Sequence, residues 1–346
     1  MVFSKTLTHW YSNNKRDFPW RKTKNPYCIW LSEIILQQTQ VKQGLPYYEA
    51  FVRTYPTVFE LASARESDVL KLWQGLGYYS RARNLHATAK YIANQCNGVF
   101  PNNHADLLKL KGVGDYTASA IASICFNEAN AVVDGNVYRV LSRYFGIKTP
   151  INSTIGIKEF KKLAQELIDK KNPAEFNQAI MEFGATQCKP KNPDCSICPF
   201  NQSCIALQKK IVDKLPVKQK AIKVRKRYFN FLVFVSQNGK TILEKRKAKG
   251  IWQNLYQFPL VESDNSLDYN DFKQLVDSHS LLNGNSFNLF LYNKDEIIHK
   301  LSHQHLHTKF WIVEVKRLPE ENVNVNDLEN FAVPVLIDNF LKSFNF

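Results

Sequence analysis

The stretch Leu110-Lys111-Gly112-Val113-Gly114-Asp115-Tyr116-Thr117-Ala118 lies between two segments with helical periodicity, 104–110 and 116–126. Two glycines one residue apart allow a tight hairpin, because glycine adopts backbone conformations that are closed to other residues. Such a hairpin opens onto the N-terminus of the following helix, where backbone amides attract phosphate. Gly-x-Gly alone is a weak pattern, and an ordinary turn between two helices is the alternative.

Four of the seven cysteines form a compact loop downstream of this hairpin, Cys188-x6-Cys195-x2-Cys198-x5-Cys204. Disulfides are disfavoured in a reducing compartment, so four close thiols indicate a metal or iron–sulfur centre. Zinc also accepts four thiolates, but its usual pattern is two close pairs separated by a longer finger. A single loop with these spacings favours a [4Fe-4S] cluster, with zinc as the alternative.

The excess positive charge is confined to the upstream part of the chain. Residues 1–227 hold 34 Lys and Arg against 17 Asp and Glu, whereas residues 228–346 hold 12 against 14. A long basic segment is typical of proteins that face the phosphate backbone of a nucleic acid. The alternative is that the charge serves solubility alone.

The length and hydropathy pattern limit the class of protein. The chain of 346 residues, 44% of them hydrophobic, is long enough for two domains with cores. Its longest apolar runs are strand-length, well short of the roughly 20 residues that a membrane span requires. The first twenty residues lack the continuous apolar region of a signal peptide. We therefore expect a cytoplasmic protein that is not secreted and has no membrane partner.

Periodicity predicts an all-α domain over 1–204, a basic linker over 205–227 and an α+β domain over 228–346. The linker holds nine Lys or Arg, one Asp and one Pro, which suits an exposed connector. A strand over 228–236, a turn at Asn238-Gly239 and residues 241–243 predict a hairpin. A further strand is expected over 306–315 and helices over 271–279 and 335–344. Upstream, helical faces recur at 28–42, 66–76, 81–95, 104–110, 116–126, 136–145 and 157–170.

The hairpin, the stretch Val132-Val133-Asp134-Gly135-Asn136 and the cysteine loop, in this order, resemble the helix–hairpin–helix DNA glycosylase superfamily. Within it, Leu31–Val41 and Trp73–Leu85 look like the adenine DNA glycosylase (MutY) family, and the likeness covers residues 7–204. It implies a six-helix barrel, from about 25 to 130, inserted into an iron–sulfur module. It also implies a monofunctional enzyme that hydrolyses the N-glycosidic bond of adenine mispaired with 8-oxoguanine or guanine in double-stranded DNA. We expect it to act as a monomer and to associate with the bacterial nucleoid.

Hydrolysis of such a bond needs a proton on the leaving base and stabilisation of an oxocarbenium-like sugar, a task for two carboxyl groups. Apolar neighbours such as Trp30 and Ile34 would raise the pKa of Glu33, which suits a general acid; the alternative is a solvated surface glutamate. Asp134 precedes a helix, whose amides would keep its carboxylate ionised, as a cation stabiliser must be. The resemblance adds adenine N7 as the proton acceptor and transient capture of the sugar by Asp134.

Further site residues rest on the resemblance alone. Gln38 and Tyr78 match positions that wedge into the duplex, although Tyr78 has core packing as its alternative. Glu182 has the alternative of a surface residue. The remaining expected DNA and substrate contacts are Thr39, Gly112 and Gly114, and the residues expected to line the adenine pocket or to position water are Tyr116, Asn136, Gln178 and Glu182. Lys111 replaces the proline that is usual in this hairpin.

Tyr116 distinguishes two related activities. The sister family, endonuclease III, uses a lysine at this position to form a Schiff base and cleave the strand, which tyrosine cannot do. One alternative function is nevertheless an endonuclease III-like glycosylase and lyase acting on oxidised pyrimidines. The other is a non-catalytic iron–sulfur redox regulator that binds DNA, against which Glu33 and Asp134 argue, since a binder needs neither.

The C-terminal region resembles the MutT-like (Nudix-fold) domain of the same family, on Gly250–Pro259 and on Leu301-Ser302-His303, where Phe-Ser-His is expected. No Gly-x5-Glu-x7-Arg-Glu-x-x-Glu-Glu pattern follows residue 250, so the domain would lack the metal-binding glutamates of a pyrophosphatase. We expect it to recognise 8-oxoguanine through Ser302 and His303. Metal binding by His303, His305 and His307 is the alternative. A chain ending near Lys210 is then expected to keep its chemistry.

Overall fold

The computed structural model describes residues 2–219, 224–278, 281–282, 286–318 and 322–346. It contains two compact units, Met1–Ser63 with Asn84–Lys220, and Ala64–Arg83 with Ala221–Phe346. The expected all-α architecture followed by an α+β architecture is confirmed, whereas the domain boundaries at 204 and 228 stay a prediction. Among the described residues, every helix falls short of the length and hydrophobicity needed to traverse a bilayer.

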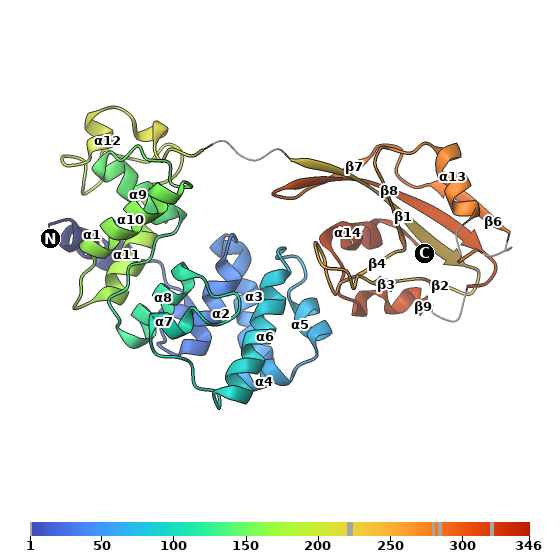
Figure 1. Cartoon of the computed structure of the whole chain (residues 1–346), viewed down its shortest axis with the longest axis horizontal. Helices are drawn as coiled ribbons and strands as arrows, with labels where there is room; N and C mark the ends of the chain where they lie inside the picture. Colours follow the sequence, from blue (N-terminus) through green and yellow to red (C-terminus); the bar gives the residue numbers. More distant parts are fainter. Residues whose placement is uncertain (1, 220–223, 279–280, 283–285, 319–321) are drawn as a thin grey trace. The chain divides into compact units, whose positions relative to one another are not determined.

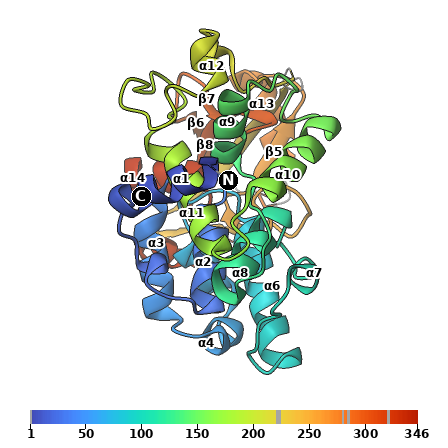
Figure 2. The ribbon, with the colours of Figure 1, turned by 90° about the vertical axis from the view of Figure 1, so that its left-hand side faces the viewer.

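The first unit is helical (Figure 1). Its elements are α1 Val2–Asn14, η1 Pro19–Arg21, α2 Pro26–Leu36, α3 Val41–Thr54, α4 Val58–Ser63, most of α6 Ser80–Gln95, α7 His104–Leu107, α8 Asp115–Phe126, α9 Gly135–Phe145, α10 Thr154–Leu167, α11 Pro173–Thr186, α12 Ile205–Gln208 and η2 Val212–Lys214. Helix α8 is buried along most of its length and packs against α2, α7 and α11. Helix α11 packs against α1, α8 and α9 (Figure 2). Because eight consecutive residues of α8, Thr117–Ile124, are buried, this helix lies at the centre of the unit.

The expected helix over 28–42 is wrong in one respect, because it breaks between Leu36 and Val41. Gln38 has a left-handed backbone, with φ of +54°, which ends the α-helical hydrogen-bond pattern. The apolar spacing continues across the break because both helices bury their apolar faces in this unit. Glu33 therefore lies in the last turn of α2, and Gln38 is exposed in the turn that follows.

The linker also differs from its expectation as an exposed connector. Residues 205–219 pack on the first unit, and Leu215 is 3% exposed. The Arg143 guanidinium donates to the carbonyl oxygens of Val212 and Leu215, and Ile151 N donates to Val217 O. The high lysine content of this segment predicted exposure, but one buried leucine and a few backbone hydrogen bonds fix it to the first unit. Residues 220–223 of the expected linker lie outside the described residues, and 225–227 begin a strand.

The second unit is built on a sheet of order β5-β1-β8-β6, with β7 also paired to β8. Strands β1 and β8 are parallel, and the other pairs in this sheet are antiparallel. Side chains of adjacent residues point to opposite faces of a strand. Accordingly, α13 covers one face through Phe272 on Trp311, with ring centroids 4.3 Å apart, and α14 covers the other through Phe340 on Phe310, at 4.2 Å.

The elements of this unit are α5 Glu66–Leu72, β1 Arg225–Ser236, β2 Lys240–Thr241, β3 Glu244–Lys245, β4 Tyr256–Gln257, β5 Leu260–Ser263, α13 Tyr269–Asp277, β6 Phe287–Leu291, β7 Ile297–Lys300, β8 Gln304–Val315, β9 Val323–Asn324, η3 Val325–Asn330 and α14 Val335–Ser343. Residue 279, at the end of the expected helix 271–279, lies outside the described residues. The expected hairpin after β1 is not a ladder: β2 pairs with β9 instead. The Ser236 side chain bonds to both backbone groups of Lys240 and takes the place of the strand pairing.

Residues 64–83 belong to this unit although they lie among the N-terminal helices in the sequence. Gln74 donates to Asp338 of α14 at 2.9 Å. The Tyr79 hydroxyl donates to Val333 O at 3.2 Å. Arg83 donates to Gln253 O at 2.9 Å. This segment and the C-terminal region therefore depend on each other for hydrogen bonds.

Candidate active site

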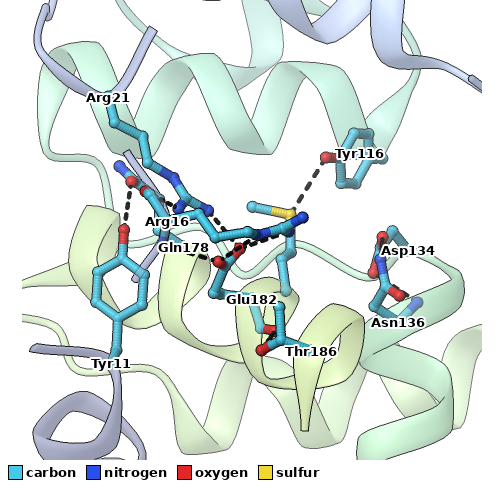
Figure 3. Close-up of polar contacts among 10 residues, drawn as sticks. Tyr11, Arg16, Arg21, Tyr116, Asp134, Asn136, Gln178, Glu182 and Thr186 are labelled. Carbon is cyan, nitrogen blue, oxygen red and sulfur yellow. Dashed lines mark hydrogen bonds and ion pairs between the residues drawn. The ribbon is translucent and has the colours of Figure 1, made fainter. Parts of the chain in front are cut away.

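A single cavity of about 180 Å³ in the first unit brings together most of the predicted catalytic residues. Its wall comes from α2, α8, the start of α9, α11 and the segment before α2. The lining residues that the sequence predicted are Glu33, Thr39, Tyr116, Asp134, Asn136 and Glu182. The hydrogen bonds around it are drawn in Figure 3. Helices distant in sequence thus present carboxyl, hydroxyl and amide groups to one small space.

Glu33 lines this cavity from the last turn of α2. Burial raises the pKa of Glu33 to about 7, the nearby Asp134 carboxyl adds to the rise, and the Tyr116 hydroxyl opposes it. A carboxyl group with this pKa is partly protonated at neutral pH. The local environment therefore equips Glu33 to donate a proton, and the alternative of a solvated surface glutamate is wrong for this half-buried side chain.

Asp134 is the N-cap of α9 and is held by three N–H donors. Its Oδ1 accepts from the backbone N of Asn136 at 2.9 Å and of Val137 at 2.8 Å. Its Oδ2 accepts from Asn136 Nδ2 at 2.7 Å. Burial is the largest effect and leaves the pKa of Asp134 raised above its ordinary value, so the hydrogen bonds and the nearby Arg139 limit the rise but do not reverse it. The donors fix the carboxylate in one orientation and favour its ionised form.

A glycine permits the close approach that positions this cap. Gly184 of α11 lies against Asn136, and a Cβ at position 184 would come within 2.9 Å of the Asn136 carbonyl oxygen. Arg139 donates to both Asn136 Oδ1 and Gly184 O, which ties α9 to α11. A larger residue at 184 would push the start of α9 away from the cavity.

Glu182 is 1% exposed and is therefore not a surface residue, so that alternative is wrong. Its carboxylate accepts from Arg16 Nε at 2.7 Å and from Arg21 Nη2 at 2.7 Å (Figure 3). Burial alone would raise the pKa of Glu182, but the hydrogen bonds from both arginines outweigh it and lower the pKa to about 2. Glu182 is thus a permanent anion that fixes two cations at the cavity wall.

Two predicted pocket residues differ in their placement. Tyr116, on α8, directs its hydroxyl to Met181 Sδ at 3.2 Å, and burial raises its pKa well above the ordinary value. Gln178 accepts from the Tyr11 hydroxyl at 2.9 Å and lines a neighbouring cavity with Tyr11 and Glu175 instead. The structure therefore does not bring Gln178 to the cavity of Glu33.

The Gly-x-Gly segment forms a tight turn at the surface. Gly112 has φ of +81°, and a Cβ there would lie 2.8 Å from the Asn84 side chain. Gly114 is the N-cap of α8, which begins at Asp115, one residue before the expected start. The Thr88 hydroxyl donates to Lys111 O at 2.8 Å and anchors the turn. An exposed helix N-terminus of this kind suits a phosphate group.

In the second unit, two predicted DNA contacts meet. Tyr78 is 49% exposed, so core packing, its alternative, is wrong. Its hydroxyl lies 2.6 Å from Ser302 Oγ. Ser302 and His303 are exposed in the turn between β7 and β8. His307 pairs with Glu296 at 2.9 Å, and no metal-holding group of three His, Cys, Asp or Glu exists among the described residues.

All four cysteines of the downstream loop line one cavity beside α9 and α11. Arg143 of α9 donates to Cys188 Sγ at 3.5 Å, and Cys204 Sγ contacts Arg143 O at 3.5 Å. In a four-iron cluster each thiolate binds a different iron, so the four sulfurs need not converge on one ion. The donor set and its shared cavity fit such a cluster.

The sequence did not reveal several residues that line the cavity of Glu33. Arg16 and Arg21 are separated from Glu182 by more than 160 residues, and no local pattern joins them. Met181 is one residue from Glu182, but its role as partner of Tyr116 depends on how α8 crosses α11. The other unpredicted lining residues are Phe18, Trp20, Leu36, Val41 and Ala185.

Comparison with protein families matches residues 31–179 to the HhH-GPD superfamily of base excision DNA repair proteins and residues 230–343 to the NUDIX domain. The adenine DNA glycosylase of Buchnera aphidicola subsp. Baizongia pistaciae (strain Bp) is 38% identical over 321 residues, covering 90% of this chain and 86% of that protein. The adenine DNA glycosylase of Homo sapiens is 44% identical over 217 residues, covering 60% of this chain and 40% of the human protein.

Two solved structures resemble the chain in fold. A thermostable thymine-DNA glycosylase has a TM-score of 0.56 and 32% identity, with 60% of this chain and 96% of that chain covered. Endonuclease III in a non-covalent complex with DNA has a TM-score of 0.53 and 20% identity, with coverage of 61% and 95%. The second likeness, at this identity, concerns the fold alone.

Proposed function

Since this chain belongs to the adenine DNA glycosylase family, we propose that it excises adenine paired with 8-oxoguanine or guanine in double-stranded DNA. Membership makes it a DNA glycosylase of base excision repair. The observation that carries the substrate chemistry is the cavity where Glu33, Tyr116 and Asp134 meet, with the pKa of Glu33 at about 7. A small cavity that combines aromatic and aliphatic walls with placed carboxyl, hydroxyl and amide groups suits one flipped base.

Glu33 protonates the leaving adenine in this mechanism. Protonation turns the base into a neutral leaving group, and an acid with a pKa near the working pH is the most effective donor. The bond to C1′ breaks and positive charge develops on the sugar. The Asp134 carboxylate, oriented by Asn136 and Val137, stabilises that charge and captures C1′ transiently before water completes the hydrolysis. Water attacks C1′ as the bond to Asp134 breaks, and the proton that this water loses returns to Glu33.

The reaction stops at base removal. A lyase needs an amine that attacks C1′ to form an imine, and the position just past the hairpin is occupied by Tyr116, whose pKa is raised well above its ordinary value. A neutral phenol is suited to donating a hydrogen bond. The product of a monofunctional enzyme is an abasic site that breaks only when alkali is added.

Cys188, Cys195, Cys198 and Cys204 hold a [4Fe-4S] cluster in this proposal. What supports it is their common cavity and the guanidinium of Arg143 beside Cys188. When bound, the cluster would fix the loop onto α9 and α11 and would carry no step of the hydrolysis. The role of the cysteine loop is then structural: it stabilises the packing of α9, the helix that begins after Asp134.

Ser302 and His303 read the base opposite the adenine. 8-Oxoguanine differs from guanine by an oxygen on C8 and a proton on N7, so a few placed polar groups are sufficient to distinguish them. The exposed turn between β7 and β8 offers both side chains, and Ser302 shares a hydrogen bond with Tyr78. Tyr78 and, separately, Gln38 are proposed to insert into the duplex.

The decisive experiment incubates the protein with a duplex containing adenine opposite 8-oxoguanine and then treats it with alkali. Breakage of the adenine strand only after alkali is the expected result. Glu33→Gln should lose the activity, whereas Glu49→Gln, an exposed glutamate on α3, is the matched control and should keep it. Release of an oxidised pyrimidine instead of adenine, or strand breakage without alkali, would overturn the proposal.

A further inference from the structure

Three basic or imidazole side chains are aligned across three neighbouring strands of the second unit. Lys226 of β1 is in register with His305 of β8, and His305 is in register with Lys300 of β7. Residues in register on neighbouring strands project from the same face of a sheet. We call Lys226, His305 and Lys300 the cationic row.

The face that carries the cationic row is open at this end of the sheet. Two residues further along, Tyr228 of β1 lies against His307 of β8, with ring centroids 4.9 Å apart. Helix α13 covers the same face only beyond that point, where Phe272 stacks on Trp311. Lys226 and Lys300 are exposed. The row is therefore accessible from outside this unit.

The charge of the row is not balanced within the described part of the unit. Neither Lys226 nor Lys300 forms an ion pair with a described residue. The carboxylates nearest in the ladder are already engaged, Glu262 with Arg227 and Glu296 with His307. Like charges aligned across strands destabilise a sheet. Two exposed lysines that flank a histidine and form no ion pair with a described residue therefore point to an anionic partner.

The row lies directly beside the turn that holds Ser302 and His303. Arg225 N donates to His303 O at 3.1 Å, and Leu301 N donates to Gln304 O at 2.9 Å, so the turn is fixed to the strands that carry the row. We propose that the cationic row binds the phosphate backbone of the DNA strand that carries the 8-oxoguanine, next to the base that the turn reads. This inference rests on the proposed function for the identity of the DNA.

The test measures the salt dependence of duplex binding. Each phosphate contact contributes roughly 0.9 to the slope of log affinity against log salt. The probe is a duplex with 2′-fluoroadenosine opposite 8-oxoguanine, whose glycosidic bond resists cleavage. K226Q/K300Q should lower the slope by about 2, and K226R/K300R should restore it. The matched control K273Q/K316Q removes the same charge from α13 and from the residue that follows β8, and it should leave the slope unchanged.

Phosphate contacts carry no base information. The same loss of slope is therefore expected on an undamaged duplex, whereas Ser302→Ala should weaken binding to the 8-oxoguanine duplex alone. An unchanged slope in K226Q/K300Q, or an equal loss in the K273Q/K316Q control, would overturn the inference. Failure of the unmodified protein to release adenine from a natural duplex would instead refute the proposed function, because the slope comparison does not depend on turnover.

Discussion

Replacing Glu33 by Gln should make the protein more stable while it removes activity. In the folded state burial raises the pKa of Glu33 from 4.5 to about 7. The folded state therefore binds a proton more tightly than the unfolded state between these values, and stability falls as pH rises through this window. This shift in the pKa corresponds to a loss of up to about 3 kcal/mol of unfolding free energy. Because the Glu33 side chain is only half-buried, solvent screening reduces that loss. Gln carries no charge, so Glu33→Gln avoids the loss.

The assay is urea unfolding of both proteins at several pH values. Near pH 4.5 the two should have similar free energies of unfolding, and above about pH 7 the variant should be more stable, by up to about 3 kcal/mol. Glu49→Gln controls for the general effect of removing a carboxylate. A variant that is inactive but equally stable at both ends of the range would refute the buried-acid account of Glu33.

Three further predictions concern the catalytic and structural groups. The single-turnover rate of adenine release should fall as pH rises above about 7, because Glu33 must be protonated to act, and a rate that stays level to pH 9 would contradict this. Glu182→Gln leaves two arginines without their buried anion and should cost roughly 3 to 5 kcal/mol of unfolding free energy. Since the pKa of Glu182 is lowered to about 2, the ion pairs of the unmodified protein are lost only as pH falls from 4.5 toward 2. Acid unfolding of both proteins measures this difference. The purified protein should absorb broadly at roughly 400 nm, and Cys198→Ala should lose that absorbance and its iron; a colourless protein with stoichiometric zinc would reverse the assignment.

Local patterns in the sequence predicted those parts of the fold that depend on local chemistry. The turn at Gly112 and Gly114 follows from the conformational freedom of glycine, and Asp134 as an N-cap follows from the helix that it precedes. The break after Leu36 was missed because apolar spacing continues through the turn. The periodicity of apolar residues shows which face of a helix is buried. When the helices before and after a turn bury the same face, the periodicity does not reveal the turn.

Long-range pairing explains the rest of what the sequence did not predict. Arg16 and Arg21 reach Glu182 only because α1 and the segment after it pack against α11. Ion pairs between residues so far apart have no periodic signature. The same limit applies to β2, which was expected to pair with the neighbouring β1 but pairs with β9 near the end of the chain. In both cases a global arrangement decides between partners that local chemistry allows equally.

Truncation of the chain would remove more than the turn that carries Ser302. A chain ending near Lys210 keeps Glu33, Asp134 and all four cysteines, and the sequence alone therefore predicts that it keeps its chemistry. Residues 64–83, however, make several hydrogen bonds to the region that is removed, and a buried polar group left unpaired costs about 1 to 3 kcal/mol. Truncation should thus lower stability and displace Tyr78 as well as remove the turn. Ser302→Ala leaves those contacts in place, so it tests the turn alone. The assay is single-turnover excision of adenine opposite 8-oxoguanine and opposite guanine. A selective loss of the preference for 8-oxoguanine would assign lesion recognition to the turn, and an unchanged preference would refute it.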